Sequence, residues 1–324
     1  GKENAIFLHV TLIPYLKSSG EMKTKPTQAS VKELQGMGIQ PDIIVCRSEY
    51  PLDNGIKDKI ALFCNVPSSH VLQNLDVEYL YEAPLAMEEE HLAQVACECL
   101  GLPCPEPNLS DWKAMCTALK HPKGEVSVAL VGKYTQLHDA YISVVESLKH
   151  GGIANGVSVN IKWVDSEKVT AENVEEFLGD VSGIIVPGGF GDRGIEGMIQ
   201  SIRYAREKKV PFLGLCLGMQ LTIVEFTRDV VGYNDAHSVE FLPGTTHPVI
   251  HLMPDQEGID DIGGTLRLGS YPCILDESSK AYALYGSREI HERHRHRYEV
   301  NNDFRNVLTE NGMLLSGISP DGRI

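Results

Sequence analysis

One ten-residue segment constrains this chain of 324 residues more than any other. Residues 211–220 read Pro-Phe-Leu-Gly-Leu-Cys-Leu-Gly-Met-Gln, so an apolar run leads into Gly-x-Cys-x-Gly and then into a predicted helix. Flanking glycines permit a sharp strand-to-helix turn that exposes the side chain at its apex. We therefore predict that Cys216 is a nucleophile, with a thiolate favoured by the helix start and an oxyanion bound by the N–H of Leu217. The alternative is an unreactive buried cysteine in a tight turn.

Strand-like and helix-like segments alternate along both halves of the chain. Apolar runs at 6–14, 42–46, 127–132, 183–186 and 210–215 read as buried strands, and 194–209 reads as a helix. This order predicts an α/β protein with two doubly wound, mostly parallel sheets, whose ligand sites lie at the carboxyl ends of the strands. A Pro-rich stretch after Gly101 interrupts the rhythm. We expect domains at 1–102 and 125–324, joined by a linker at 103–124.

Composition excludes several classes of protein. The chain has 29 Lys+Arg against 44 Asp+Glu, a net charge of −15, which argues against sequence-independent binding of nucleic acid. None of its eight cysteines forms a CxxC pair, which argues against a zinc site or a disulfide scaffold. Apart from Cys216, we expect the cysteines to be packing residues. The apolar stretches are too short to span a membrane, and we expect a cytoplasmic protein.

A second glycine-rich segment, Pro-Gly-Gly-Phe-Gly at 187–191, follows the strand at 183–186. Its backbone is expected at the same sheet edge as Cys216. Glycine allows close approach of a backbone N–H to a substrate, so this loop is predicted to supply a second oxyanion donor. A plain glycine-rich turn is the alternative, and pairing with the elbow favours the functional interpretation.

These two motifs resemble the class I glutamine amidotransferases, which hydrolyse glutamine through a cysteine thioester. Longer matches make the chain similar to one family, the CTP synthases. They are Leu-Val-Gly-Lys-Tyr at 130–134, Gly-Gly-Thr-Leu-Arg-Leu-Gly at 263–269, the run at 292–302, and, in the first half, 23–28 and 59–64. The resemblance covers essentially the whole chain. It implies the end of an amidoligase (synthetase) domain of Rossmann-like fold, followed by a flavodoxin-like amidotransferase domain.

The resemblance implies ATP-dependent amination of UTP to CTP with ammonia from glutamine. It makes Cys216 the nucleophile, and it pairs Glu240 with the α-ammonium of glutamine and Arg297 with the α-carboxylate, charges that suit a zwitterion. Surface ion pairing is the alternative for these two residues. The other implied glutamine-binding residues are Gly189, Leu217, Gly218, Met219 and Gln220.

Nucleotide sites are also implied by the resemblance. The triphosphate of UTP, or of CTP as feedback inhibitor, is expected to contact Lys23, Thr24, Lys25, Pro26, Thr27, Gln28 and Lys59; a solvated basic turn is the alternative. The ATP adenine is expected beside Leu75, Asp76 and Val77. GTP, an allosteric activator of the family, is expected to act through a lid at Arg193 and Gly194. Mg²⁺ accompanies ATP, with its ligands expected outside this sequence, and the family forms homotetramers.

Three histidines, His291, His294 and His296, lie within six positions and raise the alternative of a metal site. Arginines alternate with them at 293, 295 and 297 and would repel a divalent cation. We therefore expect this run to bind an anion or zwitterion rather than a metal.

The sequence departs from the family pattern in two places. The amidotransferase base lies in a His-Pro-Glu motif, yet here His121-Pro122 precedes Lys123 and His247-Pro248 precedes Val249. No phosphate loop precedes Lys23. We therefore expect a chain truncated at both ends and inactive by itself.

Two other functions stay open: a free-standing glutaminase, and a non-catalytic nucleotide- or glutamine-binding or assembly module. Selective reactivity of Cys216 with a glutamine-like electrophile distinguishes an activated nucleophile from a binding module.

Overall fold

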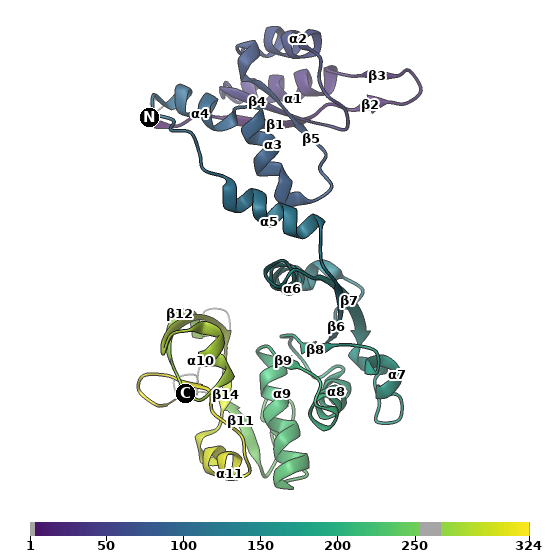
Figure 1. Cartoon of the computed structure of the whole chain (residues 1–324), viewed down its shortest axis with the longest axis vertical. Helices are drawn as coiled ribbons and strands as arrows, with labels where there is room; N and C mark the ends of the chain where they lie inside the picture. The colour runs from purple at the N-terminus through teal and green to yellow at the C-terminus, as the bar shows by residue number, and fades with distance from the viewer. Residues whose placement is uncertain (1–3, 253–266, 324) are drawn as a thin grey trace. The chain divides into compact units, whose positions relative to one another are not determined.

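A computed structural model describes residues 4–252 and 267–323. The chain divides into two compact units, residues 1–121 and 122–324 (Figure 1), and each is described by itself. The division falls between His121 and Pro122, inside the segment expected to be a linker. That segment holds a helix, α5 (Ser110–Lys120), which belongs to the first unit.

The first unit is built on a parallel sheet in the order β1-β4-β5, formed by β1 (Leu8–Leu12), β4 (Ile43–Ser48) and β5 (Val71–Leu75). Val31 and Ile60 pack with Ile44 on one face of the sheet, from helices α1 (Lys25–Gly36) and α2 (Asn54–Cys64). On the other face Val95 packs with Ile43. That residue belongs to α4 (Leu92–Leu100), which follows α3 (Ala83–Glu89). A small hairpin, β2 (Tyr15–Leu16) and β3 (Glu21–Met22), precedes α1.

The first strand is less buried than its apolar sequence predicts. Leu8, Val10 and Leu12 are 42%, 61% and 61% exposed. They alternate along β1, an edge strand, and Leu8 and Val10 are in register with Ile43 and Val45. The cluster that covers those two β4 residues does not extend to the three β1 side chains. The expectation of a buried strand at 6–14 was therefore wrong on this face, because burial depends on which strand lies at the sheet edge.

The second unit confirms the predicted doubly wound order. Its parallel sheet runs β7-β6-β8-β9, and helices alternate with the strands along the chain (Figure 1). The elements are β6 (Glu125–Gly132), α6 (Ile142–Asn155), β7 (Ser158–Asp165), α7 (Val174–Leu178), β8 (Gly183–Val186), α8 (Ile195–Lys208), β9 (Phe212–Gly214) and α9 (Leu217–Phe226). A π-helical segment, Thr227–Val231, extends α9. Met198, Leu221 and Ile184 are among the buried residues of the core between these layers.

The C-terminal part adds antiparallel pairing that the sequence did not predict. A second sheet, in the order β10-β11-β14, contains β10 (His237–Ser238), β11 (Pro248–Leu252) and β14 (Tyr298–Val300). A third, in the order β13-β12-β15, contains β12 (Arg267–Leu275), β13 (Glu289–His296) and β15 (Gly317–Ile318). Two short helices are α10 (Lys280–Tyr285) and α11 (Arg305–Glu310). Residues 263–266 of the family-like segment at 263–269 lie outside the described residues.

Short 3₁₀ turns connect several elements: Ser68–His70, Leu80–Glu82, His138–Tyr141, Ser166–Lys168 and Asn302–Phe304. Among the described helices, none has the length and apolar character that a membrane crossing requires.

Candidate active site

Cys216 lies at the turn between β9 and α9, with φ 52° and ψ −105°. A positive φ is strained for a residue with a side chain, and such strain persists only where packing enforces it. Here the two flanking glycines supply that packing. A Cβ on Gly218 would lie 2.0 Å from the carbonyl oxygen of Val186, and one on Gly214 would lie 2.6 Å from the backbone of Gly218. Both glycines are therefore required by close backbone contact.

The environment of the Cys216 thiol opposes ionisation in this structure. Cys216 is exposed as a residue, yet its side chain lines a cavity wall, and loss of hydration there raises the pKa of the thiol. The backbone N–H of Leu217 hydrogen-bonds to the sulfur and lowers the pKa, whereas the carboxylates of Glu240 and Glu299 raise it. The prediction that the thiolate is favoured was wrong, because loss of hydration raises the pKa of the thiol more than the N–H at the start of α9 lowers it.

A cavity of about 220 Å³ brings the predicted glutamine-binding residues together. Cys216, Glu240 and Arg297 line it although they are far apart in sequence. Burial raises the pKa of the Glu240 carboxyl, and the ammonium of Lys133 opposes that rise. The other lining residues are Gly189, Phe190, Gln220, Arg295, His296 and Tyr298. A carboxylate and guanidinium groups in one small cavity suit a zwitterionic ligand.

The helix that follows Cys216 contributes unequally to this cavity. Gln220 is 5% exposed, and its side-chain amide donates to the carbonyl oxygen of Tyr298 at 3.1 Å, which ties α9 to β14. Leu217 and Gly218 are buried and do not line this cavity, and the backbone N–H of Leu217 hydrogen-bonds to the sulfur of Cys216. Met219 lines a different, largely apolar cavity of about 320 Å³ that also contains Cys273 and Leu315. The structure therefore gives no side-chain support to the prediction that Met219 lies at the bound glutamine.

The loop after β8 reaches the nucleophile. A Cβ on Gly188 would lie 3.3 Å from the Cβ of Cys216. A Cβ on its neighbour Gly189 would lie 3.6 Å from Cδ2 of Leu217 and 3.7 Å from Cδ of Lys133. The loop backbone thus lies beside the thiol, as the motif predicted.

Sequence reasoning missed the role of Lys133. This residue directly follows β6 and is 5% exposed, and its ammonium donates to the carbonyl oxygens of Phe190, at 3.1 Å, and Gly191. The signal in the sequence is the short motif at 130–134, which carries part of the family resemblance. A lysine at the carboxyl end of a parallel strand could have been singled out on position alone.

The histidine-rich run lies on β13 and shows why three histidines do not converge. Side chains alternate along a strand, so His291 is exposed with Arg293 and Arg295, whereas His294 and His296 are half-buried on the opposite face. His296 pairs with Glu299 at 3.2 Å. Across the residues that the structure describes, no group of three or more His, Cys, Asp or Glu residues is arranged to hold a metal ion.

The predicted lid residues lie at the start of α8. Gly194, with φ 70°, precedes the helix. Arg193 pairs with Glu167 at 2.7 Å, donates to the carbonyl oxygen of Lys133 at 3.2 Å and lies 5.9 Å from the ring centre of Tyr134. Arg193 is thus held against the same lysine that holds the 187–191 loop.

In the first unit, most of the predicted UTP residues gather at the start of α1. Thr24 precedes the helix and accepts a hydrogen bond from Gln28, while Lys25 and Pro26 are exposed in its first turn. Thr27 is fully buried and donates to the carbonyl oxygen of Leu12 at 3.1 Å, so its hydroxyl supports the sheet.

The remaining predicted nucleotide residues are more scattered. Lys23 pairs with Glu21, and Lys59 projects from α2 into solvent. Of the predicted ATP stretch 75–77, Leu75 ends β5 and Asp76 pairs with Arg47 at 2.5 Å. The contacts of Leu75 and Asp76 by themselves give no geometric support for the predicted adenine site.

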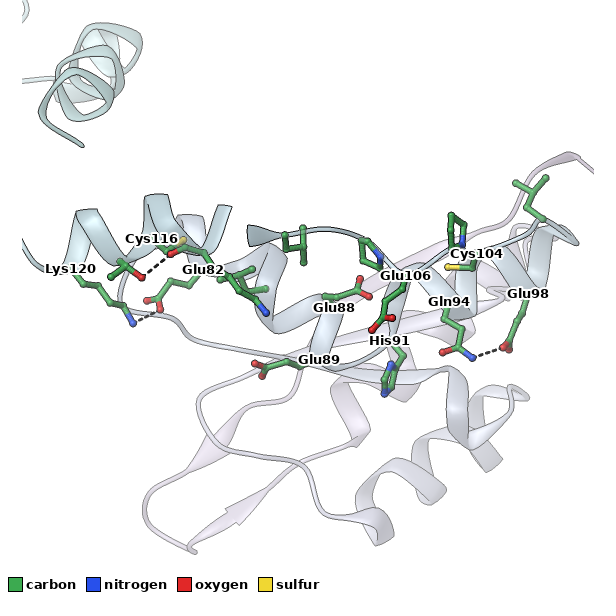
Figure 2. Close-up of a pocket in the computed structure, with 17 residues that line it drawn as sticks. Glu82, Glu88, Glu89, His91, Gln94, Glu98, Cys104, Glu106, Cys116 and Lys120 are labelled. Carbon is green, nitrogen blue, oxygen red and sulfur yellow. Dashed lines mark hydrogen bonds and ion pairs between the residues drawn. The ribbon is translucent and has the colours of Figure 1, made fainter. Parts of the chain in front are cut away.

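A larger cavity, of about 950 Å³, lies in the first unit between α3, α4 and α5 (Figure 2). Glu82, Glu88, Glu98 and Glu106 make its wall acidic. No residue predicted for catalysis or nucleotide binding lines it. Size therefore does not identify the active site here, and the smaller cavity at Cys216 holds the reactive groups.

Comparison with known proteins now identifies the second unit. The family model for class-I glutamine amidotransferases matches residues 136–323, and that for the CTP synthase N-terminus matches residues 1–102. The chain belongs to the class-I glutamine amidotransferase family. The chain is 57% identical over all 324 residues to a CTP synthase from Clostridium acetobutylicum, and 54% identical to one from Geobacillus kaustophilus.

The chain spans 61% of the length of each of these two CTP synthases. A solved structure, the glutaminase domain of Trypanosoma brucei CTPS with bound acivicin, is 38% identical with a TM-score of 0.56. That match covers 60% of this chain and 75% of the solved one.

Proposed function

We propose that the second unit hydrolyses glutamine and that the chain acts in CTP synthase, which aminates UTP to CTP with ATP and the released ammonia. The observation that carries the proposal is the cavity in which Cys216, Glu240 and Arg297 meet. Similarity to CTP synthases over the whole chain supports the substrate assignment.

The geometry supports a division of roles. Glu240 binds the α-ammonium of glutamine and Arg297 its α-carboxylate, which places the carboxamide toward Cys216. The thiolate attacks the carboxamide carbon, and the N–H groups of Leu217 and Gly189 stabilise the oxyanion. The carbon–nitrogen bond then breaks, and ammonia leaves with a proton taken from solvent; water hydrolyses the thioester to glutamate and restores the thiol. Because this sequence holds no His-Pro-Glu triplet, we expect labelling of Cys216 but little turnover by the chain alone.

For the nucleotide half, we propose that UTP, or CTP as inhibitor, contacts residues 23–28 and Lys59, and that ATP lies beside residues 75–77. GTP is proposed to act as activator through Arg193 and Gly194. Mg²⁺, when bound with ATP, would neutralise phosphate charge. We further propose a homotetramer in the cytoplasm, with residues 1–102 as the end of a synthetase domain. A UTP-induced rise in the melting temperature that Lys25→Ala abolishes, and Lys32→Ala on the same helix does not, supports the phosphate site.

Acivicin labelling tests the glutaminase proposal, because the Trypanosoma brucei domain holds this molecule. We expect Cys216 to be modified far faster than the other seven cysteines, with protection by glutamine. Glu240→Gln should weaken glutamine protection roughly 10- to 100-fold, the value of a hydrogen bond to a charged group. Glu207→Gln, a surface change on α8, is the matched control. Uniform labelling of the cysteines would instead favour the non-catalytic binding module.

A further inference from the structure

A buried lysine holds the loop that follows β8. Lys133 donates two hydrogen bonds from its ammonium, to the carbonyl oxygens of Phe190 and Gly191. Its Cδ and Cε atoms lie 3.7 Å from the position that a Cβ would take on Gly189. One side chain therefore supports three consecutive residues of the glycine-rich loop, whose first glycines lie beside Cys216.

The backbone of Lys133 is itself held from two sides. The hydroxyl of Tyr141, a residue 5% exposed, accepts the N–H of Lys133 at 3.1 Å and that of Tyr134 at 3.3 Å. Arg193 donates to the carbonyl oxygen of Lys133 at 3.2 Å. Lys133 thus connects the start of α6, the 187–191 loop and the segment before α8.

Stability alone does not account for a charge at this position. Desolvation lowers the pKa of Lys133, while the carboxylate of Glu240 raises it. A methionine of similar length would avoid the cost of burying the ammonium, and replacing buried charges with apolar groups is often neutral or stabilising. The ammonium donates to two loop carbonyls, and the carboxylate of Glu240, which lines the cavity, acts on it electrostatically.

We propose that Lys133 is a positioning residue that fixes the 189–191 backbone, so that the N–H of Gly189 is held ready for the oxyanion formed at Cys216. This inference rests on the proposed glutaminase function. Without the hydrogen bonds from Lys133, the loop has the same sequence but no longer holds the fixed orientation on which oxyanion stabilisation depends.

The test uses the γ-aldehyde analogue of glutamine, in which the Cys216 thiol adds across the carbonyl: sulfur bonds to carbon and the proton goes to oxygen. The adduct is tetrahedral and its oxygen takes the place of the oxyanion, so its affinity depends on the same N–H donors. Its affinity is measured by protection of Cys216 from iodoacetamide, whose own reaction with the thiol does not need those donors. We expect Lys133→Met to weaken aldehyde binding roughly 30- to 100-fold, with the iodoacetamide rate changed less than about twofold. Lys133→Arg should recover part of the loss, and Lys149→Met on α6 should behave as the parent chain.

Tyr141→Phe provides a second variant should Lys133→Met fold poorly, as judged by circular dichroism. It keeps the lysine and loosens its backbone, and we expect a smaller loss of aldehyde affinity, roughly three- to tenfold. Parent-like aldehyde affinity in the folded Lys133 and Tyr141 variants would overturn this inference and leave the glutaminase proposal standing. If the parent chain does not bind the aldehyde at Cys216, the proposed function falls and this inference falls with it.

Discussion

The substitution Gly218→Ala tests whether the elbow requires glycine because of close packing, since helix propensity alone would favour alanine. The added methyl carbon would lie 2.0 Å from the carbonyl oxygen of Val186 and 2.9 Å from its carbonyl carbon. Relief to ordinary contact distance requires α9 and β8 to separate by roughly 1.5 Å. The same oxygen accepts the N–H of Leu215 at 2.9 Å, so the movement also strains the hydrogen bond that precedes Cys216.

The expected cost follows from these two contributions. Overpacking costs about 1–3 kcal/mol and a strained backbone hydrogen bond about 1 kcal/mol, so the free energy of unfolding should fall by about 2–4 kcal/mol. A nucleophile misplaced by about 1 Å loses roughly 100-fold in rate, so acivicin labelling of Cys216 should slow by a similar factor.

Gly151→Ala is the matched control, because the same substitution in α6 meets no atom within 4 Å. There the methyl group improves helix propensity, and we expect a gain of up to about 1 kcal/mol. The assay is urea unfolding followed by the fluorescence of Trp163 on β7, in a Trp112→Phe background, since the chain has two tryptophans. Equal urea midpoints for the Gly218 variant and its parent, or equal destabilisation by both substitutions, would refute the packing argument.

Three further predictions concern groups outside the active site. Glu225 is 1% exposed, and Nη2 and Nε of Arg206 donate to its Oε1 at 2.7 and 2.9 Å. Arg206→Met should therefore lower the free energy of unfolding by about 3–5 kcal/mol at pH 7, because it leaves a buried carboxylate without its partner. Because burial raises the pKa of Glu225, this deficit should shrink in urea titrations as the pH falls toward 5 and the carboxyl binds a proton. Hydrogen bonds, of which the one from Thr246 has the largest effect, lower the pKa of Asp235. The melting temperature of the parent chain should therefore fall as the pH drops below about 4, and that of Asp235→Asn should fall less. Burial raises the pKa of Cys46 to about 12, so mass spectrometry should find it unmodified by iodoacetamide at pH 8 until urea unfolds the chain.

Local patterns predicted the architecture well where one element carries the signal. The strand-turn-helix elbow around Cys216 and the parallel order of both sheets follow from apolar runs, glycines and element alternation. Local patterns predicted burial less well where the exposure of a residue depends on which element packs beside it. β1 is as apolar as a central strand, yet Val10 is 61% exposed because the strand lies at an edge.

The helix α6 gives a second example. Two adjacent glycines such as Gly151 and Gly152 are typical of a helix end, but α6 continues to Asn155 and ends at Gly156, whose φ is 68°. Gly152 is required instead by the approach of β7, because a Cβ there would lie 2.6 Å from the carbonyl oxygen of Val157. The same residue type thus serves a turn in one place and close packing in another, and the difference depends on a distant strand.

Cysteine usage was also predicted only in part. Cys46, Cys64 and Cys116 are buried, as packing residues should be, whereas Cys104 is exposed in the Pro-rich segment. Its exposure depends on how that segment lies against the first unit, which local sequence does not specify.

The sequence by itself determined the elbow at Cys216 and the parallel α/β order, whereas the roles of Glu240 and Arg297 were implied only by the resemblance to the CTP synthases. The elbow and the parallel order depend on local backbone preference and on residue chemistry. Only the tertiary structure decided that Glu240 and Arg297 meet Cys216 in one cavity, that Met219 turns away from it and that Lys133 holds the loop beside it. Such contacts join residues up to 81 positions apart in the chain, and their geometry is set by how sheets and helices pack rather than by any local pattern.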